Sequence, residues 1–576
     1  MSLSPVQPAE PWRQRLIRTL LYGKNVDRHV KARARVGFAI LAFVSVYAVI
    51  AGKLVLFGIT SESNEASRRA AQDATATARP DILDRNGTIL ATDVKASSLF
   101  GEPRRLVDRD EAVELLTGAL PDLDAAEVRQ RLGTRKGFVW LKREITSAQE
   151  RQIHRLGIPG IGFLRENKRV YPSGPVVSHL IGHVNIDNQG IAGIEKWLDS
   201  NGLADLHMAG FANDRQQEPV ELAVDLRVEH ALRDELLKAK EKYKAKAAAG
   251  LVSNVQTGEI VAMVSVPDYD PNNPREANDP TRINRLTTGV FEMGSTFKSL
   301  TLAMALDSGK ATINTLYDAR GPLRYGRFNI RDTHPMGRAI TLAEVFTYSS
   351  NIGAARIALS QGVEAHKAFL KKLGQLDRLR TELPESAQPI VPKRWGELNT
   401  VTISFGHGLS VAPLQAVMGI NALVNGGYLI PPTFLKRSKA EAMKLATQVV
   451  KPETSQKMRY LMRLNAEIGT AKKAEVPGYY IGGKTGTSEK VVNGRYMRKQ
   501  VLNSFTAILP SDNPKYQLLI MLDEPQPLKE TFGFITSGWN TVPTGGKVIA
   551  RIAPLLGIEP RFDLPPSDRL ILAATR

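Results

Sequence analysis

The 576-residue chain contains no cysteine, which excludes disulfide bonds, thiol catalysis and zinc sites built on thiolates. Its nine histidines show none of the spacings, such as H-E-x-x-H, by which histidines hold a metal ion. The sequence also lacks internal repeats and low-complexity tracts, and its length argues for at least two domains. We therefore expect a multidomain chain that needs no metal and no other cofactor, and whose stability comes from its hydrophobic cores alone.

An uncharged apolar run lies near the N-terminus. It covers Val36–Gly52 and continues past Lys53, so that residues 36–58 are long enough to cross a bilayer. Polar residues at 61–65 stand where a cleavable signal would have small residues, which predicts an uncleaved anchor. Two acids and eight cations precede the run: Glu10, Asp27, Arg13, Arg15, Arg18, Lys24, Arg28, Lys31, Arg33 and Arg35. This excess of cations predicts a cytoplasmic N-terminus, with the remainder of the chain beyond the membrane.

The segment Ser295-Thr296-Phe297-Lys298 sets a hydroxyl and an amine three residues apart. On a helix these two positions share a face, and the run from Ser295 to Leu306 is mostly apolar, as in a buried helix. A serine is a poor nucleophile without a neighbouring base, and a lysine becomes a base only when its pKa is lowered by burial or by a second cation. We interpret Ser295 as a candidate nucleophile and Lys298 as its base, although a surface helix can carry such a pair by chance.

A second lysine, Lys484, opens the run Lys-Thr-Gly-Thr. Strand-like runs at 501–509 and 516–522 follow, so we expect Lys484 on a strand. Gly486 and the two glycines before Lys484 leave room for a peptide beside the backbone. Lys484 is then the second cation that lowers the pKa of Lys298, whereas by itself such a glycine-rich run is also typical of a hairpin turn.

The two threonines of this run offer hydroxyls to a carboxylate. We interpret Thr485, Gly486 and Thr487 as substrate-binding, and the backbone N–H groups of Thr487 and Ser295 as an oxyanion hole. Residues 478–485 also satisfy the phosphate-loop pattern G-x-x-x-x-G-K-[ST]. Nucleotide binding is disfavoured because Pro477 stands where a strand should end and glycines interrupt the helix that should follow.

Ser349 and Asn351 fall on a predicted turn between two helical runs. Serine and asparagine are preferred helix caps, and a cap is the simplest interpretation of the pair in isolation. Together with Ser295 and Lys484, they are better explained as part of a catalytic site. Ser349 would relay a proton to a leaving amine, and Asn351 would bond the substrate amide or Lys298.

The first half of the chain alternates short strands and helices from Arg79 to about Val224. The clearest predicted helices cover Asp110–Leu120 and Ala125–Leu132. A linker is expected at 60–78 and a polar loop at 201–218.

The second half begins with a predicted helix over 225–249, for which Gly250 is the expected stop. Two runs, Leu251–Val255 and Ile260–Val266, flank Thr257-Gly258 and predict a hairpin. These elements indicate a domain of helices and sheet from about residue 226 onward.

The three motifs come in a fixed order, about 50 and then about 130 residues apart, and this order resembles the signature of the serine acyl-transferases that act on D-Ala-D-Ala peptides and β-lactams. More narrowly, the chain is similar to class B penicillin-binding proteins, and among them to the division-specific (septal) peptidoglycan D,D-transpeptidases. Met293 stands where the family usually has proline. Further matching segments are Arg79–Gly87, Lys168–Pro172, Gly190–Glu195, Thr257–Met263, Phe405–Ser410, Asn425–Gly427, Gly494–Tyr496 and Phe505–Pro510.

The resemblance implies an α+β fold with an N-terminal transmembrane helix. An elongated α/β pedestal domain follows, and then a penicillin-binding/β-lactamase-like transpeptidase domain whose antiparallel sheet is flanked by helices. The expected parts are a cytoplasmic basic tail at 1–35, the anchor at 36–58, a pedestal of the dimerisation type at 59–225 and the transpeptidase domain at 226–576. The implied location is the bacterial inner membrane, with the catalytic domain in the periplasm.

The resemblance also implies that the chain cross-links stem peptides through a serine acyl-enzyme during cell division and is inhibited by β-lactams. We expect it to meet a SEDS-type glycosyltransferase and other division proteins. Its net charge of +19 suits anionic lipid and wall polymer, and without any nucleic-acid motif we expect no nucleic-acid partner. An elongation-specific transpeptidase and a β-lactam-hydrolysing or -sensing relative stay open as alternatives.

Overall fold

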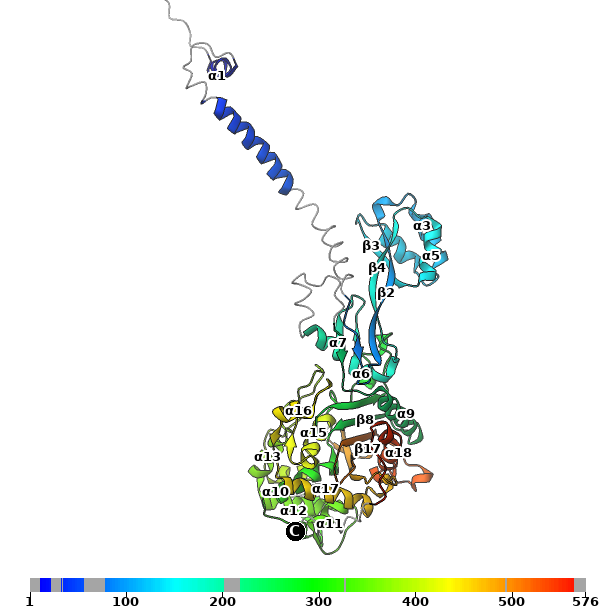
Figure 1. The fold of residues 1–576 in the computed structure, drawn as a ribbon, viewed down its shortest axis with the longest axis vertical. Coiled ribbons are helices and arrows are strands. Elements are labelled where there is room, and N and C mark those ends of the chain that lie inside the picture. The colour runs from blue at the N-terminus through cyan, green and yellow to red at the C-terminus, as the bar shows by residue number, and fades with distance from the viewer. Residues whose placement is uncertain are drawn as a thin grey trace, which may run out of the picture. The chain divides into compact units, whose positions relative to one another are not determined.

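The computed structural model describes residues 11–21, 33, 35–55, 78–200, 218–325, 328–492 and 495–563 (Figure 1). Nearly all of the expected linker at 60–78 and of the expected loop at 201–218, together with Gly494, lie outside these residues.

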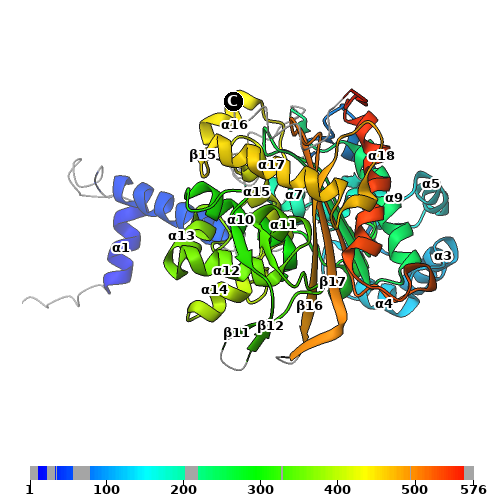
Figure 2. The ribbon, with the colours of Figure 1, turned by 90° about the horizontal axis from the view of Figure 1, so that it is seen from below.

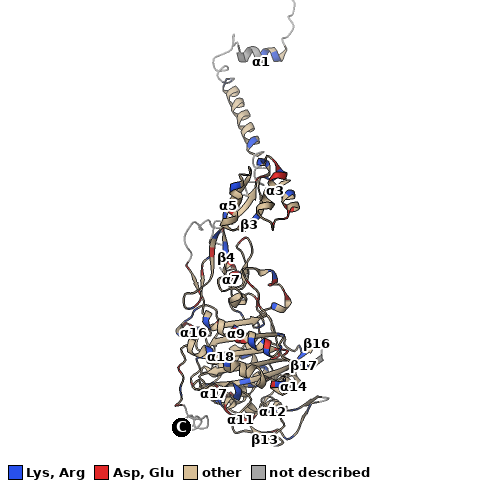
Figure 3. Ribbon diagram, turned by 90° about the vertical axis from the view of Figure 1, so that its right-hand side faces the viewer, with Lys and Arg blue, Asp and Glu red and all other residues tan. Residues whose placement is uncertain are grey.

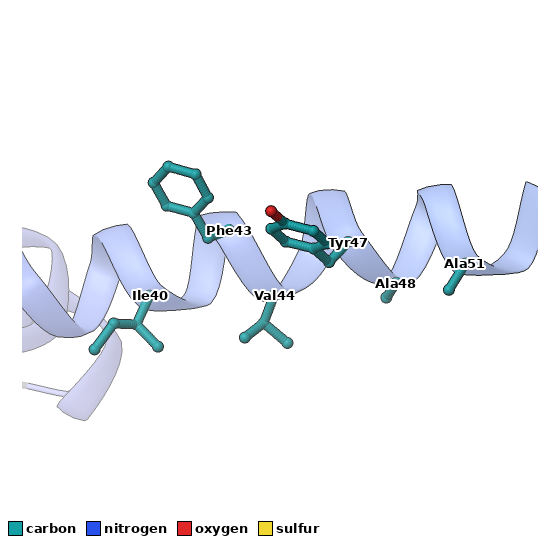
Figure 4. Close-up of a pocket in the computed structure, with 6 residues that line it drawn as sticks. All are labelled: Ile40, Phe43, Val44, Tyr47, Ala48 and Ala51. Carbon is teal, nitrogen blue, oxygen red and sulfur yellow. The ribbon is translucent and has the colours of Figure 1, made fainter.

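An apolar helix covers Arg35–Val55 and has a mean hydropathy of 2.2. Its large side chains are exposed; Phe43 and Tyr47 are each 67% exposed, and Figure 4 shows them projecting from the ribbon. By length and composition this helix can cross a membrane, and it fits a single-pass anchor. Residues 56–58 of the expected anchor lie outside the described residues. A shorter helix, α1 (Trp12–Leu21), precedes it.

The chain forms two compact units. One contains residues 96–166 together with the chain before residue 76, and the other contains 76–95 and 167–576. The expected boundary between pedestal and transpeptidase domain, at residues 225 and 226, differs from the division into these two units and stays a prediction.

Within residues 96–166, three α-helices and three strands, two of which continue into the second unit, enclose a core that includes Leu99, Leu116 and Leu141. The central strand β2 pairs with β3 and with β4. The elements are β2 (Ile89–Gly101), α3 (Arg109–Ala119), α4 (Ala125–Leu132), β3 (Val139–Ile145), α5 (Ser147–Leu156) and β4 (Ile161–Val170). The two helices predicted for this region are therefore confirmed to within one residue at each end.

The second unit begins with short elements, namely β1 (Ile82–Leu83), α6 (Ser178–Ile181), β5 (His183–Val184), β6 (Gly190–Ala192), α7 (Gly193–Leu198) and β7 (Val220–Glu221). A buried ion network ties them together. The fully buried carboxylate of Glu195 accepts from Arg79 Nε at 2.8 Å and from Arg169 Nε at 2.6 Å. Arg169 also pairs with Asp93 at 3.2 Å. Three matching segments, Arg79–Gly87, Lys168–Pro172 and Gly190–Glu195, thus meet at the Glu195 carboxylate. Their charged residues are needed to neutralise one another in a buried position.

A five-stranded antiparallel sheet organises the rest of this unit, in the order β16-β17-β18-β8-β9. Its strands are β8 (Ala247–Asn254), β9 (Ile260–Val266), β16 (Gly482–Val492), β17 (Arg495–Leu509) and β18 (Tyr516–Asp523). The predicted hairpin and the two predicted strands after Lys484 are confirmed. Because β16 ends the sheet, it pairs with a strand on one side only, as the order shows.

Helices cover both faces of this sheet (Figure 2). On one face, α9 (Leu226–Lys242) and α18 (Thr541–Leu555) share a core with residues of β8, β17 and β18. On the other face, the core is larger. Its helices are α10 (Lys298–Asp307), α11 (Leu342–Thr347), α12 (Asn351–Gln361), α13 (Val363–Lys372), α14 (Glu397–Ile403), α15 (Pro413–Val424) and α17 (Pro452–Glu467). A further helix, α16 (Lys439–Leu445), precedes α17 and adds no residue to this core.

Three two-stranded ribbons complete the helical side: β10 (Leu316–Asp318) with β13 (Ala339–Thr341), β11 (Leu323–Tyr325) with β12 (Phe328–Ile330), and β14 (Tyr428–Leu429) with β15 (Thr447–Gln448).

The helix predicted over 225–249 is wrong at its C-terminal end. It stops at Lys242, and Ala247–Ala249 begin β8 instead. Alanine favours helices when isolated, but here small residues let α9 pack closely on the sheet. A Cβ atom on Gly250 would stand 2.8 Å from Leu232 Cδ1 and 3.1 Å from Leu236 Cδ1. Gly250 is therefore a packing residue inside a strand, and tertiary contacts override the local preference.

Candidate active site

Ser295 lies in a 3₁₀ turn, Gly294–Phe297, that leads directly into α10. A 3₁₀ turn places residues three apart above one another, and Lys298 Nζ lies 3.0 Å from Ser295 Oγ. The turn must begin with glycine, because Gly294 has φ +54° and a Cβ atom there would stand 2.7 Å from the Thr487 carbonyl oxygen. Met293 is buried, and its carbonyl oxygen accepts from Thr296 Oγ1 at 2.8 Å.

The side chain of Lys298 is fully buried and surrounded by oxygens. Its Nζ lies 2.8 Å from Asn351 Oδ1 and 2.5 Å from the Ser349 carbonyl oxygen, neither of which can donate. These two acceptors take two N–H bonds. The remaining position on nitrogen faces the hydroxyls of Ser295 and Ser349, each 3.0 Å away. In the neutral amine this position is the lone pair, which is what a base needs to accept the Ser295 proton.

Burial lowers the pKa of Lys298 well below its usual value, and the charge of Lys484 lowers it further, whereas Asp332 acts in the opposite direction. Burial also lowers the pKa of Lys484 to about 7. Lys484 Nζ donates to Ser349 Oγ at 2.9 Å, so one hydroxyl contacts both lysines. Both amines therefore lose their protons far more readily than exposed lysines do.

Ser349 connects α11 to α12 with φ +59°, a left-handed conformation that non-glycine residues seldom adopt. Such strain costs about 1–3 kcal/mol and is typical of functional sites. The cap of α12 is Ser350, whose Oγ accepts from Gly353 N. Asn351 is the first residue of α12 rather than part of the turn, and its Nδ2 donates to the Arg331 carbonyl at 3.0 Å, which leaves Oδ1 toward Lys298.

Lys484, Thr485, Gly486 and Thr487 lie on the edge strand β16, as predicted. A strand continues after Thr485 where a phosphate loop would require a helix, so the nucleotide alternative is wrong. A Cβ atom on Gly486 would stand 2.6 Å from the Met293 carbonyl oxygen, and the one on Gly294 would be 3.1 Å from Thr487 N. These short distances place the Thr487 backbone beside the Gly294–Phe297 turn that carries Ser295, as an oxyanion hole requires.

Hydroxyl partners of the two threonines were missed by sequence reasoning. Thr485 Oγ1 lies 2.8 Å from Thr470 Oγ1, and Thr487 Oγ1 lies 3.0 Å from Ser537 Oγ. The buried Asn465 supports this arrangement, since its Nδ2 donates to the Gly483 carbonyl at 2.8 Å. Its Oδ1 accepts from Thr470 N at 3.0 Å. No local pattern marks these residues, because α17, the segment that follows it and the turn before α18 reach β16 only through the fold.

Asp332 is a further residue that sequence reasoning missed. Its Oδ1 accepts from the backbone N–H groups of Asn351 at 2.5 Å and Ile352 at 3.0 Å. Its Oδ2 accepts from Ser350 Oγ at 2.6 Å. The carboxylate thus binds the positive N-terminus of α12 and fixes Asn351 against Lys298. Asp332 belongs to no sequence motif and is identified only by its contacts with Ser350 and Asn351.

The matching segment Phe405–Ser410 also belongs to this site. A Cβ atom on Gly406 would stand 2.0 Å from the Gly294 carbonyl oxygen, so this turn lies directly against the serine turn. The carboxylate of Glu292 joins it to β17, accepting from Gly408 N at 2.8 Å and from Tyr496 OH at 3.1 Å. Among the described residues, no group of three acidic, histidine or cysteine side chains could hold a metal ion.

Comparison with known proteins identifies the family. Residues 248–537 match the penicillin-binding protein transpeptidase domain, and residues 74–201 match the penicillin-binding protein dimerisation domain. The probable peptidoglycan D,D-transpeptidase FtsI of Caulobacter vibrioides is 40% identical over 497 residues, covering 84% of this chain and 83% of that protein. The chain belongs to the penicillin-binding protein transpeptidases. Its expected family, α+β fold class and enzyme class are thereby confirmed.

Other relatives agree with this assignment. The probable D,D-transpeptidase PenA of Neisseria meningitidis is 30% identical over 93% of this chain and 95% of its own. FtsI of Escherichia coli is 29% identical over 84% of each. A peptidoglycan synthetase structure from Bifidobacterium adolescentis has a TM-score of 0.65 at 22% identity and covers 86% of this chain and 98% of its own, which supports the fold of this penicillin-binding protein.

Proposed function

We propose that this penicillin-binding protein is the division-specific peptidoglycan D,D-transpeptidase of its cell. Ser295 is the nucleophile, Lys298 its base, and Ser349, Asn351 and Lys484 complete the catalytic group. The observation that carries the proposal is the position of Lys298 Nζ, 3.0 Å from Ser295 Oγ with two N–H bonds directed at pure acceptors. The FtsI and PenA names of the relatives support the reaction, and FtsI supports the division role.

In the first half-reaction, Ser295 Oγ attacks the carbonyl carbon of the penultimate D-Ala while Lys298 accepts the hydroxyl proton. The N–H groups of Ser295 and Thr487 stabilise the oxyanion that forms. When the tetrahedral intermediate collapses, the C–N bond to the last D-Ala breaks. Ser349, in contact with both lysines, passes a proton to the leaving amine, so that an ester on Ser295 and free D-Ala result.

In the second half-reaction, the amine of another stem peptide attacks this ester. Lys298 and Ser349 carry the amine proton back to Ser295, and a new amide bond replaces the ester. The substrate lies along β16, where the open edge accepts backbone pairing. Thr485 and Thr487 donate hydroxyl bonds to its terminal carboxylate, and the positive charge of Lys484 favours that carboxylate.

A reaction of the purified full chain with penicillin and with stem peptides tests this proposal. Mass spectrometry should find the penicillin adduct on the peptide that carries Ser295, and Ser295→Ala should abolish it. A stem pentapeptide with an added amine acceptor should give the cross-linked dimer. Rapid release of hydrolysed penicillin would instead identify a β-lactamase, and a stable adduct without cross-linking would identify a sensor.

The orientation and the partners belong to the same proposal. The cationic excess before residue 36 supports a cytoplasmic N-terminus and a periplasmic catalytic domain in the inner membrane. A SEDS-type glycosyltransferase and other division proteins are the proposed partners of the anchor and pedestal. Figure 4 shows the short side chains of Ala48 and Ala51 beside the larger Val44. Small side chains let the backbones of two membrane helices approach each other closely.

A helix exchange and a fluorescent fusion test the partner and the location. Replacing 36–58 by an unrelated transmembrane helix of equal length should abolish co-purification of the glycosyltransferase. If the partner is retained and cells divide normally, the helix is only a tether. A fusion that labels the lateral wall rather than the septum would favour the elongation-specific alternative.

A further inference from the structure

The helix α1 (Trp12–Leu21) lies ahead of the apolar anchor and takes no part in the proposed chemistry. Its sequence, WRQRLIRTLL, combines three arginines with no acidic residue. Figure 3 shows the basic bands on this helix. Three arginines in ten residues without an acid make this helix strongly cationic.

The helical register separates apolar from polar positions. With 3.6 residues per turn, Trp12 and Leu16 fall on one face, and Gln14 falls on the other side. Trp12 is 71% exposed and Leu16 is 55% exposed. A tryptophan and a leucine in water, one turn apart, form an apolar face that needs a partner.

At least one arginine lies next to this apolar face. The Arg13 guanidinium carbon lies 5.6 Å from the centre of the Trp12 ring, so a cation stands directly beside the apolar side chain. The helix sequence contains two more arginines, Arg15 and Arg18. Charge and Trp12 would also suit a single-stranded nucleic acid, whose bases stack on aromatic rings, but the exposed Leu16 and the apolar anchor that follows favour a lipid surface. Cations combined with an exposed tryptophan match the boundary between anionic head groups and acyl chains.

Chain continuity keeps the helix close to that boundary. The residues 22–34 between Leu21 and Arg35 span at most about 50 Å, whatever their conformation. A helix tethered to a membrane anchor over this distance meets the lipid surface at a high effective concentration, so even a weak intrinsic affinity suffices.

We propose that α1 is an interfacial helix that lies on the anionic leaflet next to the anchor. Trp12 and Leu16 enter the boundary of head groups and acyl chains, and the positive charge of the helix attracts the lipid phosphates. The inference rests on the membrane anchor of the proposed function and not on the catalytic roles. The proposal gives α1 a lipid-binding role in addition to the effect of its positive charge on the orientation of the anchor.

The lack of cysteine makes the test direct, because a single introduced thiol is the only labelling site. Leu16→Cys and the matched control Gln14→Cys are labelled with an environment-sensitive dye in the full chain. Each is reconstituted into phosphatidylcholine vesicles with or without about 30% phosphatidylglycerol, a typical anionic lipid. Quenchers attached to lipid and quenchers in water then report where each dye lies.

In anionic vesicles, the dye at residue 16 should be quenched by the lipid-attached group and the dye at residue 14 by the aqueous one. Replacing the three arginines by glutamine in the Leu16→Cys chain should weaken surface binding by about 100-fold, from about 1 kcal/mol per cation. A dye at residue 16 that stays in water overturns the proposal and leaves the apolar face to a protein partner. A dye that stays in lipid without the arginines overturns the anionic selectivity. Labelling by fluorescent penicillin in the same vesicles reports separately on the catalytic proposal.

Discussion

Replacing Lys484 by methionine should stabilise the folded chain while it abolishes acylation. Lys484 is fully buried, and its pKa is lowered to about 7 from 10.5. At 1.36 kcal/mol per pKa unit, keeping this ammonium in the fold costs about 4 kcal/mol at pH 7. Methionine has a similar length and no charge, and it loses the bond to Ser349, which is worth about 2 kcal/mol. The net gain at pH 7 is about 2 kcal/mol.

The gain should depend on pH in a defined direction. A lysine whose pKa is lower in the folded than in the unfolded chain destabilises the fold fully below pH 7, and this effect disappears as the pH rises toward 10.5. Between pH 7 and about pH 9.5, the advantage of Lys484→Met should therefore shrink by about 3 kcal/mol and change sign.

Thermal unfolding of the full chain in detergent measures this difference. For the second unit, residues 76–95 and 167–576, 2 kcal/mol corresponds to a rise in Tm of about 2 °C. Lys490→Met is the matched control on the same strand, since Lys490 is partly exposed and pairs with Asp523 at 2.9 Å and Glu524 at 2.6 Å. This control should not gain stability. A Lys484→Met chain that melts below the wild type at pH 7, by the same margin at every pH, would refute the reasoning.

Three further predictions concern other residues. Lys298→Ala should slow acylation by more than about 100-fold, because both the base and the partner that positions Ser295 are lost; a near-wild-type rate of penicillin acylation would contradict this. Asp332→Asn should move the acid limb of the acylation rate to lower pH, because the Asp332 charge raises the pKa of Lys298 while Lys484 lowers it, whereas a merely structural role would lower the rate without moving the limb. Glu195→Gln should lower stability by about 3–5 kcal/mol, because it leaves the buried guanidiniums of Arg79 and Arg169 without their shared charge; an unchanged Tm would show that other acceptors compensate.

Sequence reasoning could place the candidate reacting groups on their elements because these groups lie in short motifs. Ser295 and Lys298 stand three residues apart, and the runs after Lys484 and its neighbouring glycines predict a strand with room for a peptide, whereas its position at the sheet edge comes from the fold. Asp332, Thr470 and Asn465 could not be found in this way. Each acts through a partner far along the chain, and only the fold makes that partner a neighbour.

The error at the end of α9 has a related cause. Alanine at 247–249 is a good helix former, but the same small side chain suits a strand that must pass beneath a closely packed helix. Alanine is thus favoured both in an isolated helix and in a strand packed closely under a helix, so its presence does not distinguish the two. The motifs Arg79–Gly87 and Gly190–Glu195 were identified by resemblance alone, and their physical reason, the buried carboxylate of Glu195, became clear only from the contacts.

The open edge of β16 has a consequence for solubility. An edge strand with unpaired backbone groups invites any extended chain, including an unfolded copy of the same protein, and can seed aggregation. Here the edge must stay open for catalysis, so protection has to come from its flanks. The register of β16 shifts between Glu489 and Lys490, just beyond Thr487, which twists the remainder of the strand and adds charge there. The regular part of the edge, from Gly482 to Glu489, therefore ends in a twisted and charged segment, which limits the length over which a second chain can pair.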